Sequence, residues 1–220
     1  TSFLEGWEKS FEAGFSGEVG ESEETDIYLR LNLDYEDDRK RWRHRSQFLY
    51  GLDDGDVDEN EFTTSLLRDW LIPDSNLFYF TGAGYEYDDF EQWTHRIRAF
   101  GGIGYTFFEL DLLTLRGGLG AGLNAELGGS QEDELIPEGL VGVELDWQVT
   151  DDQRFSLSNV LFPQLDDVGE FRNTTTAQYV IDINRGDGLS LKFGIQNDYD
   201  STDDESANDL DYFGGLVLDF

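Results

Sequence analysis

Apolar side chains occupy every second position over the last twelve residues of the chain. One face of the segment 209–220 carries Leu210, Tyr212, Leu216, Leu218 and Phe220. Asp211, Gly215 and Asp219 fall on the other face. This alternation predicts a β-strand with one apolar face. A final strand that ends on an aromatic residue is typical of bacterial outer-membrane barrels.

The same alternation recurs along the whole chain and predicts about twelve strands in one domain, residues 1–220. We expect them at 7–19, 27–35, 42–52, 62–72, 77–87, 93–107, 113–125, 135–149, 155–162, 171–183, 189–199 and 209–220. They exceed the roughly 5–6 residues of an average strand in a soluble protein. They are suited to the roughly 9–11 residues needed to cross a bilayer. The segment 62–72 fits two registers, with either Arg68 or Asp69 outward, and a β-bulge is a third interpretation.

Short and long connections alternate along the chain. The short ones are 37–41, 73–76, 108–111, 151–153 and 184–188, whereas longer ones such as 53–61 and 198–211 carry most of the acid. Aromatic residues gather at the strand ends, as expected for two girdles at lipid–water interfaces. The periplasmic girdle would hold Trp7, Trp42, Trp70, Trp147 and Phe220, and the extracellular girdle Trp93. The predicted fold is therefore all-β: a transmembrane antiparallel β-barrel of the bacterial outer membrane, with short periplasmic turns and longer acidic extracellular loops.

Composition excludes several classes of function. The chain has no cysteine, so disulfides and thiolate metal sites are absent. A net charge of −33 argues against nucleic acid, because phosphate contacts need a basic face. Nothing in the sequence indicates a cofactor. The chain opens at Thr1 without the basic and apolar regions of a signal peptide, so we expect that any such segment has been removed.

Several short motifs resemble, in their order and spacing, the salt-induced outer-membrane proteins, a bacterial family of unknown function. The motifs are Gly6-Trp7, Gly14 to Gly17, Arg41-Trp42, GGIGY at 101–105, NDYDS at 197–201, DLD at 209–211 and the terminal Phe220. The resemblance implies an outer-membrane location and a link to salt or osmotic conditions, and it brings no catalytic residues. The expected partners are outer-membrane lipid and, through the last strand, the barrel-assembly machinery.

Strand alternation places most of the basic residues of the strands inside the barrel, among carboxylates. The predicted lumen network comprises Arg30, Asp34, Arg43, Arg45, Arg96, Arg98, Arg116, Glu126, Glu144, Asp146, Arg172 and Lys192. Two interpretations stay open. The charges pair into an ionic plug, as small barrels fill their interior, or they line a polar conduit. The corresponding functions are an envelope-supporting barrel and a small channel.

A patch of inward glycines marks three consecutive strands. It consists of Gly82, Gly84, Gly102, Gly104, Gly118, Gly120 and Gly122. A wall without side chains leaves room, so either an inward ring such as Phe80 or Phe100 covers it, or a pocket remains. Because Arg96, Arg98 and Arg116 lie beside this patch, we hypothesise a cavity that favours a small anionic or sugar-like guest.

Two further patterns suggest chemistry. His44 and Ser46 share an outward face, which resembles the lipid-facing His-x-Ser of outer-membrane phospholipase A; a lipid hydrolase is therefore the alternative function. A serine nucleophile also needs a group that orients its base, and none is evident, so interfacial polar residues are the favoured interpretation. Asp54, Asp56 and Asp58 alternate like a calcium loop but lack the spacing of an EF-hand, and solvated acid is favoured there.

Overall fold

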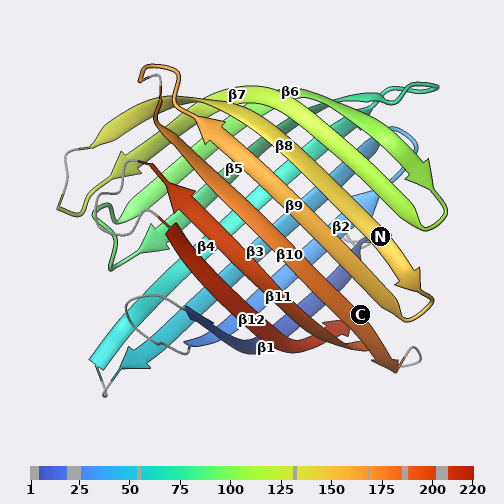
Figure 1. The fold of residues 1–220 in the computed structure, drawn as a ribbon, viewed down its shortest axis with the longest axis horizontal. Coiled ribbons are helices and arrows are strands. Elements are labelled where there is room, and N and C mark those ends of the chain that lie inside the picture. Colours follow the sequence, from blue (N-terminus) through green and yellow to red (C-terminus); the bar gives the residue numbers. More distant parts are fainter. Residues whose placement is uncertain are drawn as a thin grey trace.

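The computed structural model describes residues 5–18, 26–53, 56–130, 133–167, 169–184, 188–201 and 208–220. Within these residues twelve antiparallel strands form a closed barrel, in which each strand pairs with its sequence neighbours and β1 pairs with β12 (Figure 1). The strands are β1 (Glu8–Glu18), β2 (Asp26–Glu36), β3 (Lys40–Asp53), β4 (Asp56–Leu71), β5 (Leu77–Asp88), β6 (His95–Leu110), β7 (Leu113–Leu127), β8 (Glu134–Thr150), β9 (Gln153–Pro163), β10 (Phe171–Asn184), β11 (Leu189–Asp200) and β12 (Asn208–Asp219).

Both chain ends lie at one end of the barrel, together with the turns between β2 and β3, β4 and β5, β6 and β7, and β8 and β9 (Figure 1). We call this the terminal end and the opposite end the loop end. Closure extends to the last residue, because the Phe220 amide donates a 2.9 Å hydrogen bond to the Lys9 carbonyl. The predicted all-β barrel of about twelve strands is confirmed. No helix in the described residues is long and apolar enough to cross a membrane.

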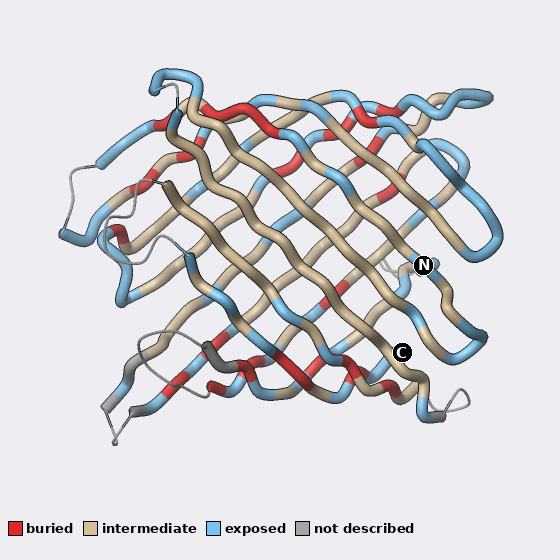
Figure 2. The backbone as a smooth tube through the Cα atoms, viewed as in Figure 1, coloured by how far each residue is buried: buried red, intermediate tan, exposed pale blue. Residues whose placement is uncertain are grey.

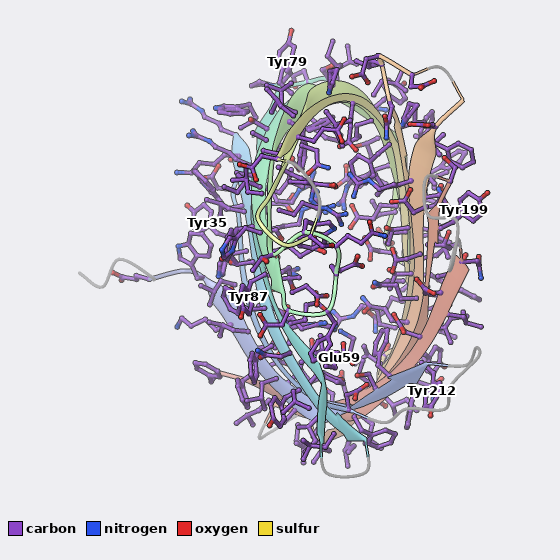
Figure 3. All side chains as sticks on the ribbon, turned by 90° about the vertical axis from the view of Figure 1, so that its left-hand side faces the viewer. Tyr35, Glu59, Tyr79, Tyr87, Tyr199 and Tyr212 are labelled. Atoms are coloured by element: carbon purple, nitrogen blue, oxygen red, sulfur yellow. The ribbon has the colours of Figure 1, made fainter. Side chains whose placement is uncertain are left out.

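The strands turn apolar side chains outward and polar ones inward. Along β5 exposed and buried positions alternate from Leu77 to Ala83, and Figure 2 shows such positions interspersed along the strands. Large apolar residues stand on the outside, among them Ile27, which is 66% exposed, and Leu119, which is 65% exposed. Figure 3, which views the loop end, shows Tyr79 and Tyr199 on the outer surface and Glu59 inside an oval wall. The outside therefore forms an apolar belt, and the lumen receives the charges.

The structure decides the register of β4. Arg68 faces outward, and Asp69 faces the lumen with no exposed surface. The register shift between β3 and β4 lies outside the segment 62–72: Gly51 pairs with Glu59 and Leu52 with Val57, so the extra residue is on β4.

Several connections are shorter than we predicted, among them 198–211, since β11 runs to Asp200 and β12 begins at Asn208. The segment 53–61 is mainly strand, since β4 begins at Asp56 and Leu52 pairs with Val57. Carboxylates tolerate a strand conformation there because alternation turns Glu59 and Glu61 inward, where they line the cavity at the loop end of the barrel. Likewise β6 runs to Leu110 through a register shift, so the turn predicted at 108–111 shrinks to 111–112. Local pairing satisfies more backbone groups than an open loop would.

The girdle residues divide between two environments. Trp7 packs on Tyr35 with ring centroids 5.6 Å apart, and Trp147 and Phe220 are exposed on the outside. Trp93 departs from the expectation: it is 3% exposed and lies under the Arg96 guanidinium, 4.0 Å from its ring centroid. Its preceding loop turns back over the barrel mouth, where the amides of Thr94 and Ser130 donate to the carbonyls of Leu127 and Gln92.

Candidate channel lumen

The loop end holds a cavity of about 400 Å³ inside the barrel. Its lining includes six carboxylates, from Asp26, Glu59, Glu61, Asp88, Glu91 and Asp211, and one guanidinium, from Arg30. Burial raises the pKa of Glu91, which lies in the loop between β5 and β6, although the Arg96 charge opposes the rise. Acidic side chains outnumber basic ones six to one at this mouth, and the surrounding wall concentrates the field of those that are ionised.

A buried cluster lies below the mouth, where β1, β2 and β11 come together. Glu12 accepts hydrogen bonds from Lys192 Nζ at 3.0 Å and from Asn32 Nδ2 at 2.7 Å, and Arg30 Nη1 lies 3.3 Å away. Arg30 Nε also donates to Gln47 at 2.8 Å. Lys192 and Arg30 thus share the Glu12 carboxylate. The side-chain amides of Asn32 and Gln47 supply the further hydrogen bonds that these charged groups need.

A second cluster lines β5 to β8. Glu86 forms ion pairs with Arg96 at 3.4 Å and with Arg98 at 2.9 Å. Arg96 Nε also donates a hydrogen bond to Glu126 at 3.0 Å. Arg172 on β10 pairs with Glu138 on β8 at 2.5 Å. Each of these guanidiniums has a carboxylate partner. Among the described residues these pairs compete with any anionic guest for the guanidiniums, and the hypothesised guest stays a prediction.

A third cluster lies toward the terminal end and crosses the lumen. Asp69 pairs with Arg41 at 2.8 Å and with Arg43 at 3.5 Å. Arg43 on β3 also reaches Glu144 on β8, with Nη1 2.8 Å from Oε2. Five strand pairings separate β3 from β8 along the wall, so this ion pair bridges two distant parts of the lumen. On the remaining predicted residues, Arg45 pairs with Asp34 at 2.8 Å and Arg116 with Asp146 at 3.6 Å.

Aromatic rings cover most of the glycine patch. A Cβ atom at Gly102 would lie 2.6 Å from Phe80 Cζ, and one at Gly118 would lie 3.0 Å from Phe80 Cε1. Gly104 is covered by the Phe78 ring and Gly82 by the Phe100 ring, whereas a Cβ at Gly122 would meet the Ala99 carbonyl oxygen and the Cβ of Phe100. Gly120 also lies under Phe80, whereas Gly84 has Arg98 beside it. Both outcomes that we considered for this patch occur, since rings cover most of the glycines and a cavity remains beside Gly118.

A second cavity, of about 280 Å³, adjoins these rings. Its lining is largely apolar, with Phe78, Phe80, Leu140, Val160 and Phe162, and the charged groups of Arg43, Asp69, Arg116 and Glu144 also border it. The lumen thus has an acidic vestibule at the loop end and an apolar chamber beside the third charge cluster.

The chain is similar to known proteins at the level of family and fold. A family model described as "Protein of unknown function, DUF481" matches residues 11–220. The chain belongs to the DUF481 family. No curated protein matches it. The family description names neither an activity nor a link to salt, so the expected link with salt stays a prediction.

Solved structures share the fold of this DUF481 barrel. An outer-membrane channel from Pseudomonas putida F1 has a TM-score of 0.59 at 10% identity, with 98% of this chain and 96% of that chain covered. The NanC porin has a TM-score of 0.58 at 10% identity, covering 94% and 98%. The KdgM porin in complex with disordered oligogalacturonate has a TM-score of 0.52 at 9% identity, covering 96% and 99%. Identities this low establish the barrel architecture alone.

His44 and Ser46, which we predicted on the outward face of this DUF481 barrel, lie within hydrogen-bond distance of each other. Ser46 Oγ lies 3.0 Å from His44 Nε2 and 2.8 Å from Thr64 Oγ1. Among the described residues no carboxylate or amide bonds to the other ring nitrogen of His44, so the group that would orient a catalytic base is missing from this part of the chain. The other histidine, His95, lies 3.0 Å from the Tyr85 hydroxyl through Nδ1.

The candidate calcium residues Asp54, Asp56 and Asp58 lie outside the described side chains. Within the described side chains no group of three or more His, Asp or Glu has the arrangement of a metal site.

Sequence reasoning missed several partners of the lumen arginines. Asp69, Glu86 and Glu138 were absent from the predicted network, yet each pairs with an arginine at 2.9 Å or less. Glu86 and Glu138 lie at the alternate strand positions that face the lumen, so strand alternation alone could have predicted them. Asp69 required the register of β4.

Proposed function

We propose that this DUF481 barrel is a small outer-membrane channel that favours cations and neutral polar solutes over anions. The termini face the periplasm and the loop end faces the outside. The outward apolar belt supports insertion in a bilayer, and the fold shared with outer-membrane channels agrees with it. The barrel-assembly machinery and outer-membrane lipid remain the expected partners.

One observation carries the choice of solute. The vestibule of about 400 Å³ presents six carboxylates against a single guanidinium. A mouth lined by one sign of charge concentrates counter-ions and repels ions of like charge. The KdgM porin holds oligogalacturonate, a polymer of acidic sugars; carboxylates at the mouth would disfavour such a guest here. Salt screens this field, with a Debye length of about 10 Å at 0.1 M, so ionic strength would tune selectivity.

Planar-bilayer recordings test this proposal. Under a KCl gradient the wild-type protein should give small conductance steps and a reversal potential that shows preference for K⁺. The double variant Asp26→Asn/Asp211→Asn removes two vestibule carboxylates and should shift the reversal potential toward zero. As a matched control, Glu5→Gln/Glu109→Gln removes two charges at the terminal end and should leave the preference unchanged. A silent protein would favour the envelope-supporting barrel, and preference for Cl⁻ would contradict the proposed selectivity.

A further inference from the structure

Three cations stand on the outer surface at the terminal end, although the protein is strongly acidic. Lys9, Lys40 and Arg68 occupy outward positions of β1, β3 and β4. Lys9 lies over the Phe220 ring at 6.0 Å from its centroid, and Lys40 lies 3.7 Å from Asp37 in the turn. Of these three, Arg68 differs in that aromatic rings surround its guanidinium.

Arg68 is held between two indole rings. Its guanidinium carbon lies 4.7 Å from the Trp42 centroid and 4.5 Å from the Trp70 centroid. Its Nε atom is buried and has no hydrogen-bond partner among the described residues, so a ligand from outside would meet the two terminal nitrogens, for which no described residue is an acceptor. Among the described residues, the outward positions of the flanking strands β3 and β5 carry no carboxylate. An arginine with unused donors at an aromatic girdle fits an anionic oxygen group supplied from outside the protein.

A groove of small side chains starts at Arg68 and crosses the outer surface. The cross-strand pairs run from Arg68 to Thr81, then to Gly101, Ala121 and Gly139. The adjacent row is large and exposed, with Tyr79 at 54%, Ile103 at 53% and Leu119 at 65%. On the other side Ala83 and Ala99 widen the groove over β5 and β6. The groove ends where Pro163 covers Gly139, since a Cβ there would lie 3.0 Å from Pro163 Cγ.

The groove rises through the belt from the terminal end. Arg68 lies three residues before the last residue of β4, Leu71, at the terminal end, whereas Gly139 lies five residues after the first residue of β8, Glu134, at the loop end. Neighbouring strands are about 4.8 Å apart, so the path from Arg68 to Ala121 spans about 14 Å. One leaflet of a bilayer has a hydrocarbon thickness of about 15 Å, half of the roughly 30 Å core. The groove therefore has the length of an acyl chain in the leaflet whose headgroups lie at Arg68.

We infer that the outer face of β4 to β7 binds one anionic glycerophospholipid of the periplasmic leaflet. The phosphodiester oxygens accept hydrogen bonds from the Arg68 guanidinium. One acyl chain lies in the groove over Thr81, Gly101 and Ala121. This inference rests on the membrane location in the proposed function and is independent of whether the lumen conducts.

Lipid retention tests this site. The full-length protein is reconstituted in vesicles of equal parts phosphatidylglycerol and phosphatidylethanolamine, extracted in mild detergent and analysed by native mass spectrometry. We expect the wild type to keep one phosphatidylglycerol. Arg68→Gln should lower its occupancy about tenfold, which corresponds to about 1.4 kcal/mol. Ala121→Leu, which fills the groove without touching the charge, should also lower the occupancy.

Two matched controls separate the site from general effects. Lys9→Gln removes another outward cation of the terminal end, and Ala13→Leu enlarges another outward alanine, on β1; both should keep the lipid. Equal retention by Arg68→Gln and wild type would overturn the inference. So would equal loss in Lys9→Gln, or displacement of the lipid by inorganic phosphate alone, because a free anion would then suffice. Flotation with the vesicles is scored separately: a protein that does not float contradicts the membrane location instead.

Discussion

Arg43 and Glu144 face each other across the lumen and form an ion pair, with Nη1 of Arg43 2.8 Å from Oε2 of Glu144. They lie 101 residues apart in the sequence. The pair stands beside the apolar chamber, and Asp69 holds Arg43 from its other side at 3.5 Å. In the proposed channel, this pair therefore narrows the path between the two ends of the barrel.

Removing this bridge should widen the conducting path. Arg43→Gln leaves a side chain too short to span the lumen, so single-channel conductance in planar bilayers should rise. Arg45→Gln is the matched control, because Arg45 lies on the same strand and pairs with Asp34 on the neighbouring β2. If both variants conduct like the wild type, the Arg43–Glu144 pair does not limit the path.

The pair between Lys192 and Glu12 should stabilise the seam at which the barrel closes. It links β11 to β1 across β12, where Lys192 pairs in register with Gly215. Lys192→Met leaves the buried Glu12 carboxylate with Arg30 as its one cationic partner. The variant should lose about 3 kcal/mol of folding free energy. Urea unfolding in lipid vesicles measures the loss. The double variant Lys192→Met/Glu12→Gln should lose less than the two single variants combined, and additive losses would show that the two groups do not interact.

The loop end should face the outside of the cell. Because the chain has no cysteine, single cysteines report topology without background. Asp166→Cys, in an exposed position between β9 and β10, should react with a membrane-impermeant maleimide on intact cells. Asp151→Cys, in the turn between β8 and β9, should react only after the envelope is broken. The reverse pattern would invert the proposed orientation.

The turn between β2 and β3 should depend on pH through Asp37. Its Oδ1 accepts from the Arg39 amide at 2.9 Å and from the Lys40 amide at 3.0 Å, and these bonds, the one from Arg39 first, lower the pKa of the carboxyl. A lowered pKa in the folded state means that this stabilisation is complete above the unfolded value of about 3.9 and is lost as the pH falls below it.

Amide chemical shifts of Arg39 and Lys40 follow that transition by NMR. The midpoint should lie below about 3.9, and Asp37→Asn should abolish the transition. Asp152→Asn, in a different turn, is the control and should keep it. A midpoint at or above the unfolded value would contradict the stabilising role of these bonds.

The outward pair His44 and Ser46 should have no hydrolytic activity. Ser46 shares its hydroxyl between His44 and Thr64, and no described group orients the imidazole. Ser46→Ala should cost about 1 kcal/mol of stability through the lost hydrogen bonds and change no release of fatty acid from phospholipid. Calcium-dependent release by the wild type that vanishes in Ser46→Ala would establish the lipid hydrolase instead.

The alternation of side chains by itself determined the barrel of about twelve strands and the inward position of most lumen residues. Side-chain direction in a strand repeats every two residues, so Arg30, Arg98 and Lys192 could be placed inside from local sequence. The same logic failed for Arg68 and Asp69. Both are charged and adjacent, so alternation does not say which of the two faces the lumen. Only pairing with β3 and β5 fixed the register there.

Tertiary structure alone decided which charges meet and what fills the space between them. The approach of Arg43 to Glu144 depends on the curvature and closure of the whole sheet, which no local pattern encodes. Likewise, the glycine patch signalled room, but rotamers and neighbouring strands determined that Phe78, Phe80 and Phe100 cover much of it. The row of small residues beyond Arg68 also arises from register across four strand pairings. Alternation is a property of each strand, whereas ion pairs, ring packing and grooves are properties of the strands together.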